Sequence, residues 1–172
     1  MSLENKRIAV LAEEQYDLLE LWYPTIRMKE EGAEVVIIGT GKPSYKSKEG
    51  KIVEVDMNAT DADGDDFDGI IIPGGFAPDK MRRYPAVLDL VRKIHHQGKP
   101  VAFICHAGWV PISAKIVEGK TVTSTVGIRD DLINAGAIWV DQEVVIDGNM
   151  ITSRGPNDLP AFCKAVIKAF SE

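Results

Sequence analysis

The chain has 172 residues and a net charge of -6. An acidic surface repels phosphate, which argues against nucleic acid or an anionic membrane as partner, and no apolar run approaches the ~20 residues that span a bilayer. Two cysteines make no disulfide framework, and the N-terminus has no secretory pattern, so we expect a cytoplasmic protein with reduced thiols. The length favours a single domain over residues 1–172.

Short apolar runs alternate with helical patterns along the chain. Near-continuous apolar runs predict strands buried on both faces of a parallel sheet, at 7–12, 33–39, 67–75 and 100–105. Helices are predicted over 18–31 and 85–97; Pro24 predicts a kink or a late start in the first, and Pro85 suits the start of the second.

Two further segments have the alternation of partly exposed strands. Residues 51–56 predict a half-exposed strand, and residues 143–153 predict a hairpin around Asp147-Gly148. Together these elements predict an α/β fold, a three-layer sandwich with a mostly parallel sheet and one antiparallel hairpin.

In such a fold the turns at the carboxyl ends of the strands meet, and three of them stand out here. The first, "EEQYDLLE", is acidic and would repel a phosphate, and no G-x-G-x-x-G sequence occurs, so no nucleotide cofactor is expected. The second contains Gly74 and Gly75, which let backbone N–H groups approach a ligand. A simple tight turn explains these glycines equally well.

The third turn begins at Cys105, at the tip of an apolar run and directly before a helical pattern. A cysteine at such a turn projects into the cleft, where the helix N-terminus favours the thiolate, so Cys105 is interpreted as a nucleophile elbow with a lowered thiol pKa. The alternative is a small core cysteine. By contrast, Cys163 follows the helical spacing of an apolar face and is expected to pack in the core.

The number and positions of the histidines limit the classes of enzyme that the chain could form. The chain has three, His95, His96 and His106, and none follows residue 106. A triad of an elbow cysteine with a downstream histidine is therefore excluded, and His106 is the candidate base. Neighbouring helical positions diverge, so His95 and His96 are not expected to share a metal, and the acidic stretch 61–68 is better explained as a solvated loop.

Three segments resemble the PfpI intracellular-protease family, peptidase family C56. They are "PGGFAPDKMR", "VAFICHAGW" and "GIRDDLINAGAIWVDQEVVIDGNMITSRGPNDLPAF", and the resemblance extends over about residues 7–171. This family belongs to the class I glutamine-amidotransferase-like superfamily, with the parkinsonism-associated protein. The resemblance implies a flavodoxin-like sandwich, a cysteine on a strained elbow, and neither cofactor nor metal. Members are described as cysteine peptidases, glyoxalases, deglycases and stress proteins.

Carried over residue by residue, the resemblance places the nucleophile on Cys105 and its histidine on His106. The family's acid in the glycine turn, which reaches the histidine of a neighbouring subunit, falls on Asp79. The acid that hydrogen-bonds the thiol falls on Asp17, where the family usually has Glu; Glu14 could substitute, or Asp17 could simply cap the helix from residue 18.

The expected chemistry follows from this assignment. The Cys105 thiolate attacks a carbonyl, and the backbone N–H groups of Gly75 and His106 hold the oxyanion. Trp109 is expected either to line the pocket or to pack there. We expect glyoxalase- or deglycase-like action on 2-oxoaldehydes or their adducts, with a peptide as the other substrate class. A redox-sensing or chaperone-like stress protein with an oxidisable Cys105 is the alternative. Asp79 at an interface would require a dimer or a hexamer.

Overall fold

The computed structural model describes residues 2–172. Its strands are β1 (Arg7–Leu11), β2 (Glu34–Gly39), β3 (Ser44–Lys46), β4 (Ile52–Glu54), β5 (Met57–Asn58), β6 (Gly69–Ile72), β7 (Val101–Ile104), β8 (Thr121–Val122), β9 (Ile138–Trp139), β10 (Val145–Asp147) and β11 (Met150–Ser153). Its α-helices are α1 (Leu18–Glu30), α2 (Ala77–Met81), α3 (Pro85–His96), α4 (Trp109–Ser113), α5 (Arg129–Asn134) and α6 (Leu159–Ser171). Short 3-10 turns include η3 (Cys105–Gly108), η4 (Val126–Ile128) and η5 (Pro156–Asp158).

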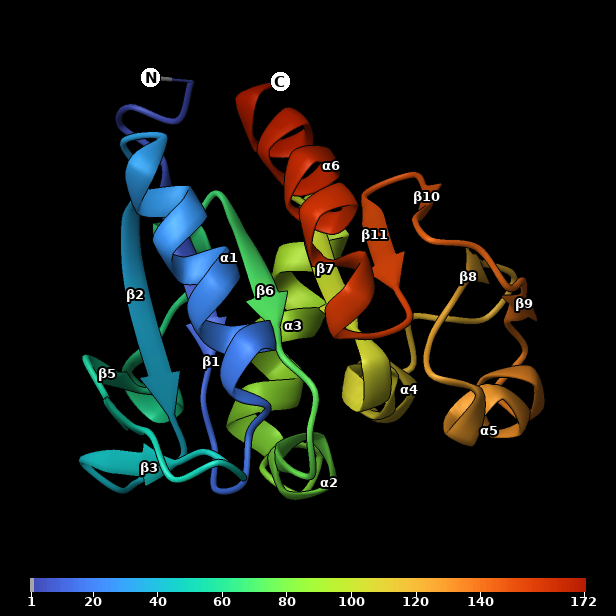
Figure 1. Ribbon diagram of the computed structural model, residues 1–172, viewed down its shortest axis with the longest axis horizontal. Coiled ribbons are helices and arrows are strands. Elements are labelled where there is room, and N and C mark those ends of the chain that lie inside the picture. Colours follow the sequence, from blue (N-terminus) through green and yellow to red (C-terminus); the bar gives the residue numbers. More distant parts are fainter. Residues whose placement is uncertain (1) are drawn as a thin grey trace.

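The main sheet has seven strands in the order β10-β11-β7-β6-β1-β2-β5. All neighbouring pairs in it are parallel except β10 and β11, which form the hairpin predicted around Asp147-Gly148. Helices α1 and α6 cover one face and α3 covers the other (Figure 1), so β6 and β7 are buried along their whole length. The α/β sandwich with a mostly parallel sheet is therefore confirmed.

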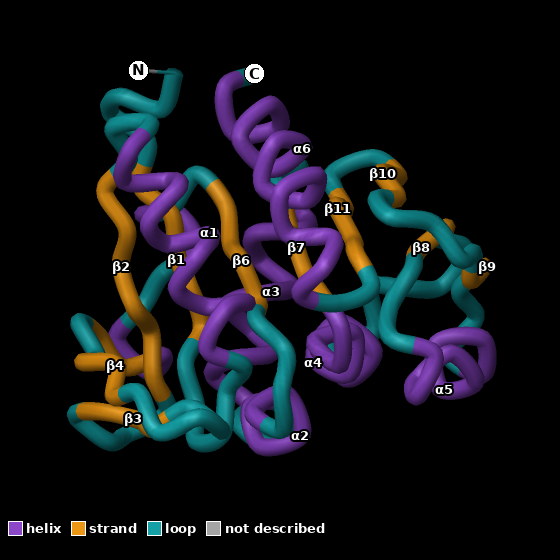
Figure 2. The backbone as a smooth tube through the Cα atoms, viewed as in Figure 1, coloured by secondary structure: helices purple, strands orange, loops and turns teal. Residues whose placement is uncertain are grey.

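The elements differ from the predicted ones in two places. Residues 52–54 do not join the main sheet but pair with β3 as a second antiparallel hairpin, at the lower left in Figure 2. Of the two outcomes predicted from Pro24, a kink or a late start, the late start is wrong: α1 begins at Leu18 and runs through Pro24. Asp17 makes this start favourable, because its carboxylate accepts the N–H groups of Leu19 and Glu20.

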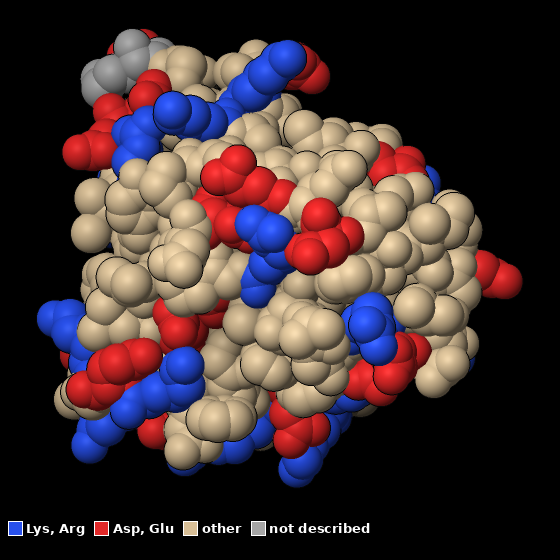
Figure 3. All heavy atoms as spheres, turned by 45° about the vertical axis from the view of Figure 1, so that its right-hand side comes forward, with Lys and Arg blue, Asp and Glu red and all other residues tan. Residues whose placement is uncertain are grey.

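The carboxyl ends of the parallel strands lie at one edge of the sheet, at the bottom of Figure 1, where α2 and α4 gather. The chain ends lie at the opposite edge. The face in Figure 3 carries both signs of charge side by side rather than a field of one sign. Among residues 2–172 no helix combines the length and the apolar character needed to cross a bilayer.

The packing of α6 on the sheet depends on the absence of a side chain at Gly69. A Cβ atom at this position would overlap with Cε1 of Phe170 and would lie 2.7 Å from the carbonyl oxygen of Pro100. We expect Gly69→Ala to lower the free energy of unfolding by about 1–3 kcal/mol, because a buried ring or the backbone must move. The midpoint of urea unfolding measures this effect.

Gly155→Ala is the matched control. The space around Gly155 is open and its φ is 177°, an extended conformation that alanine adopts freely. The control should stay within about 0.5 kcal/mol of the natural protein. Equal midpoints for the two variants would contradict this account of the packing.

Candidate active site

Cys105 follows β7 directly and adopts a backbone conformation that is rare for a residue with a side chain. Its φ is +62°, in the left-handed region, so the chain turns sharply from the strand into η3. The side chain is partly exposed, whereas Cys163 lies in the core with 1% exposure. The sharp turn and the partial exposure agree with the predicted elbow at Cys105.

His106 is the polar ring nearest to the thiol. Its Nδ1 lies 3.3 Å from Sγ of Cys105. Burial lowers the pKa of His106, and the positive charge of Lys48 lowers it further, so the imidazole is neutral at neutral pH. A neutral imidazole can accept a proton from the thiol or from a bound substrate.

The carboxyl group beside the thiol belongs to Glu20, not to Asp17. Glu20 is fully buried in α1, and its Oε1 lies only 2.6 Å from the position that a Cβ of Gly74 would occupy. The same absent Cβ would lie 2.9 Å from Cβ of Cys105. Gly74 therefore leaves the gap through which the carboxyl approaches the cysteine.

Asp17 has a different place. One oxygen caps α1, and the other forms an ion pair with Nζ of Lys48 at 3.1 Å. Glu14 is half-buried, and its N–H donates to the carboxylate of Glu13. The expectation that Asp17 or Glu14 hydrogen-bonds the thiol is thus corrected, because the helix turns Glu20 inward three residues later.

The thiol pKa also differs from the sequence-based expectation. Burial raises the pKa of Cys105 to about 12, and the carboxylate of Glu20 raises it too, while the backbone N–H groups of His106 and Gly75 act in the opposite direction. The helical segment after Cys105 is short, four residues of η3 and five of α4, and its dipole does not outweigh the burial. The expected low pKa is therefore not found.

Glu20 has an unusual ionisation of its own. Burial raises its pKa to about 8, and the negative charge of Asp17 adds to the effect. Among the described residues neither carboxyl oxygen has a well-formed hydrogen bond. At neutral pH Glu20 is therefore protonated, which removes its negative charge from the thiol and provides an O–H donor that favours a thiolate.

Lys48 is a site residue that the sequence analysis missed. It lies between β3 and β4, and its Nζ is 5.9 Å from the centre of the exposed Phe76 ring as well as close to Asp17. Tyr16 fixes this arrangement, because it forms β-bridges with both Ser47 and Gly75. The hairpin thus places a cation at the edge of the site.

The other predicted residues also lie around this turn. Gly75 has a φ of +83°, and its missing Cβ would lie 2.5 Å from the backbone nitrogen of Asp17. The ring of Trp109 lies 5.3 Å from that of His106. Asp79 does not reach His106 within the chain: it pairs with Arg83 at 2.8 Å, and 48% of its side chain is exposed.

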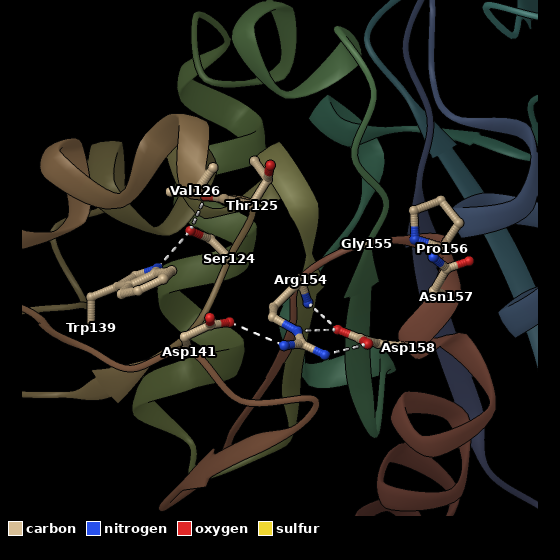
Figure 4. A pocket seen from close by; sticks show the side chains of 10 residues that line it. All are labelled: Ser124, Thr125, Val126, Trp139, Asp141, Arg154, Gly155, Pro156, Asn157 and Asp158. Atoms are coloured by element: carbon tan, nitrogen blue, oxygen red, sulfur yellow. Dashed lines mark hydrogen bonds and ion pairs between the residues drawn. The ribbon is translucent and has the colours of Figure 1, made fainter.

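A hollow of about 340 Å³ lies beside the elbow and is drawn in Figure 4. Thr125 belongs to its wall, and the N–H of Thr125 donates to the carbonyl of Cys105 at 3.3 Å. Arg154, in the middle of the hollow, is paired with Asp141 at 3.0 Å and with Asp158 at 2.9 Å. The hollow therefore shares a wall with the elbow, and its arginine is already neutralised.

Known proteins resemble the chain along nearly its whole length. The model of the DJ-1/PfpI family matches residues 6–169. The deglycase PfpI of Pyrococcus furiosus is 43% identical over 94% of this chain and 98% of its own. YraA of Bacillus subtilis, whose name gives a cysteine protease activity only provisionally, is 41% identical over 92% of this chain and 94% of its own.

A solved structure gives the same result for the fold. A two-domain protein from Anabaena variabilis, with DJ-1/ThiJ/PfpI-like and ferritin-like domains, superposes with a TM-score of 0.93 at 40% identity. The match covers 95% of this chain and 48% of that longer one. The resemblance expected from the three quoted segments is thereby confirmed.

The buried acid generates a prediction about stability. The pKa of Glu20 is about 8 in the folded protein and 4.5 in the unfolded chain. Between these two pH values the folded state therefore binds more protons than the unfolded state. The free energy of unfolding should therefore fall as the pH rises from 4.5 to about 8, and the loss should stop above that. Glu20→Gln cannot ionise and should not show this loss.

We expect the stability of Glu20→Gln relative to the natural protein to grow by up to about 1.4 kcal/mol per pH unit in this window. Chemical unfolding at a series of pH values measures it. Glu54→Gln, an exposed position, is the control and should show a constant difference. Parallel curves for Glu20→Gln and the natural protein would show that Glu20 is ionised in the fold.

Proposed function

The chain belongs to the DJ-1/PfpI family, and from that premise we propose that it is a cofactor-independent cysteine enzyme acting on 2-oxoaldehydes or their adducts. The observation that carries the proposal is the meeting of three groups at one sulfur atom. Cys105 stands on a strained turn, Nδ1 of His106 lies 3.3 Å from its Sγ, and the carboxyl of the buried Glu20 lies close to the same cysteine. The deglycase name of the Pyrococcus furiosus relative supports the substrate class.

The first step is formation of the nucleophile. The thiol proton passes to Nδ1 of His106, which is neutral and within reach. Protonated Glu20 then donates its O–H toward the sulfur and stabilises the negative charge in a buried place. The high thiol pKa keeps the sulfur protonated until a substrate arrives, so the charge develops together with the attack.

The second step is addition to the aldehyde. A bond forms between the sulfur and the aldehyde carbon, and the electron pair of the C=O bond moves onto its oxygen. The N–H groups of Gly75 and His106, which already favour negative charge at Cys105, donate to this oxyanion. Protonation of the oxygen gives a hemithioacetal.

The remaining steps move two protons and add one water. His106 takes the proton from the former aldehyde carbon and delivers it to the neighbouring carbon, while the hydroxyl proton of the hemithioacetal passes to the oxygen of that neighbouring carbon. The first carbon then carries the C=O of a thioester, and the neighbouring carbon carries a hydroxyl. Water attacks the thioester carbonyl, and the thiolate of Cys105 leaves. Methylglyoxal plus water thus becomes lactate, with no net oxidation or reduction.

The same groups would also process an adduct of a 2-oxoaldehyde with an amine, or cleave a peptide by acyl transfer. We favour the small substrates, because an acid supplied by a second subunit would enclose the site and exclude folded protein. The two free cysteines also suit the reducing cytoplasm, where we propose that the protein acts.

One observation favours a second candidate function, a sensor of oxidants. A buried protonated carboxyl beside a cysteine can donate a hydrogen bond to a sulfinate and so hold the oxidised form. Cys105 would then report peroxide rather than turn over a substrate, and the stress-protein role would follow. The assay below separates this function from the enzymatic one.

We further propose that the working unit is a dimer or a hexamer built from three dimers. Within one chain Asp79 pairs with Arg83 and is half exposed, so its carboxylate is accessible to a neighbouring subunit. A second copy would bring Asp79 to the imidazole of His106 and orient the base.

The enzymatic proposal predicts turnover that depends on one sulfur atom. Purified protein incubated with methylglyoxal should form lactate, and Cys105→Ser should lower the rate by at least about 10³-fold, since a hydroxyl is a far weaker nucleophile. Cys163→Ala, a core position, is the control and should keep the activity. If Cys105→Ser makes as much lactate as the natural protein and neither cleaves peptides, the enzymatic function is wrong and the sensor function is favoured.

The assembly proposal predicts complementation between inactive variants. Cys105→Ala and Asp79→Ala should each be nearly inactive. A hybrid pair joins the intact cysteine of one chain to the intact Asp79 of the other, so refolding equal amounts together should restore about a quarter of the sites. The same variants refolded separately and then mixed are the control. Absence of any gain, with subunit exchange demonstrated by mass spectrometry, would place Asp79 outside a shared site.

A further inference from the structure

Trp109 lies against the imidazole of the candidate base. The two ring centres are 5.3 Å apart and the planes are inclined by 50°, a tilted aromatic contact. Trp109 is the first residue of α4 and is partly buried, so it covers His106 from the same turn that carries the cysteine.

The indole is itself held by two other elements. Its Nε1 donates to Oδ2 of Asp131 in α5 at 2.8 Å. The guanidinium of Arg82, at the end of α2, lies 5.8 Å from the centre of the indole ring. Arg82 is fixed in turn by a 2.8 Å hydrogen bond from its Nε to the hydroxyl of Ser113. These contacts restrict the position of the indole ring of Trp109 next to His106.

A histidine at a partly exposed turn has two free side-chain torsions, and most of their combinations would take Nδ1 away from the thiol. We propose that Trp109, held by Asp131 and Arg82, is a positioning residue that fixes the imidazole of His106 with Nδ1 at the Cys105 sulfur. The proposal rests on the enzymatic function for its kinetic consequence. Its structural part concerns His106 alone and can be tested without turnover.

The surroundings of His106 support a role beyond packing. Cys105 and Trp109 face it from its own turn, Lys48 faces it from the β3–β4 hairpin, and Gly127 of η4 lies near Nε2. Burial is the main cause of its lowered pKa, and the indole of Trp109 is one of the groups that lie against the ring. Loss of the indole would therefore admit water and raise the pKa of His106 toward its ordinary value.

The test compares Trp109→Leu with Trp109→Phe and with Trp139→Leu. Phenylalanine keeps an aromatic contact with His106 but loses the bond to Asp131. Trp139 is the matched control, because its Nε1 is also bonded, to Ser124 at 2.9 Å, and a guanidinium, that of Arg129, also lies over its ring at 6.0 Å. NMR titration of the His106 ring gives its pKa, and steady-state kinetics with methylglyoxal give kcat and KM.

We expect Trp109→Leu to raise the pKa of His106 and to lower kcat about three- to tenfold with little change in KM. Trp109→Phe should give values between those of Trp109→Leu and the natural protein, because it keeps the aromatic contact with His106 and loses the bond to Asp131. Trp139→Leu should leave the titration of His106 unchanged. An unchanged titration in Trp109→Leu would overturn the proposal, and so would equal effects of the Phe and Leu variants. If the natural protein makes no lactate, the enzymatic function fails, while the titration still decides on Trp109.

Discussion

The burial of one carboxyl group against one thiol is the constraint on which the site depends. Within residues 2–172 the carboxyl oxygens of Glu20 have no hydrogen-bond partner, so the group must stay protonated or find a donor, and Cys105 is its neighbour. This contact requires that α1 starts directly after Asp17, that residue 74 has no side chain, and that the chain turns at Cys105 through a left-handed conformation. Three elements far apart in the sequence thus have mutually dependent geometries.

The loop before α1 connects these elements. Tyr16 is fully buried, pairs with the glycine turn on one side and with the β3–β4 hairpin on the other, and donates its hydroxyl to the carbonyl of Lys51. The indole of Trp22 donates back to the same hydroxyl. Because one residue bridges both segments, the hairpin and the glycine turn are held together, and Lys48 of the hairpin lies against Asp17.

Much of the fold and part of the site could be predicted from the sequence, because buried parallel strands are apolar throughout and Cys105 stands at the tip of one. The sequence analysis assigned the acid beside the thiol to Asp17 from its position along the chain. It missed Glu20 because it did not consider which face of the helix each acid occupies. Glu20, Pro24 and Met28 recur every fourth residue on the buried face of α1, and an acid in that series was the available signal. The places of Lys48 and of the Trp109–Asp131 bond depend on long-range packing, which no local pattern encodes.

The backbone at Cys105 also bears on the evolution of the chain. A left-handed conformation costs a residue with a side chain roughly 1 kcal/mol or more, and glycine would adopt it freely. A substitution of Cys105 by glycine would therefore relieve this backbone strain, but it would also remove the sulfur. A cysteine persists at this position only where selection for the function of the sulfur exceeds selection for stability. The residue at position 105 of a related chain therefore indicates whether that chain still has the function.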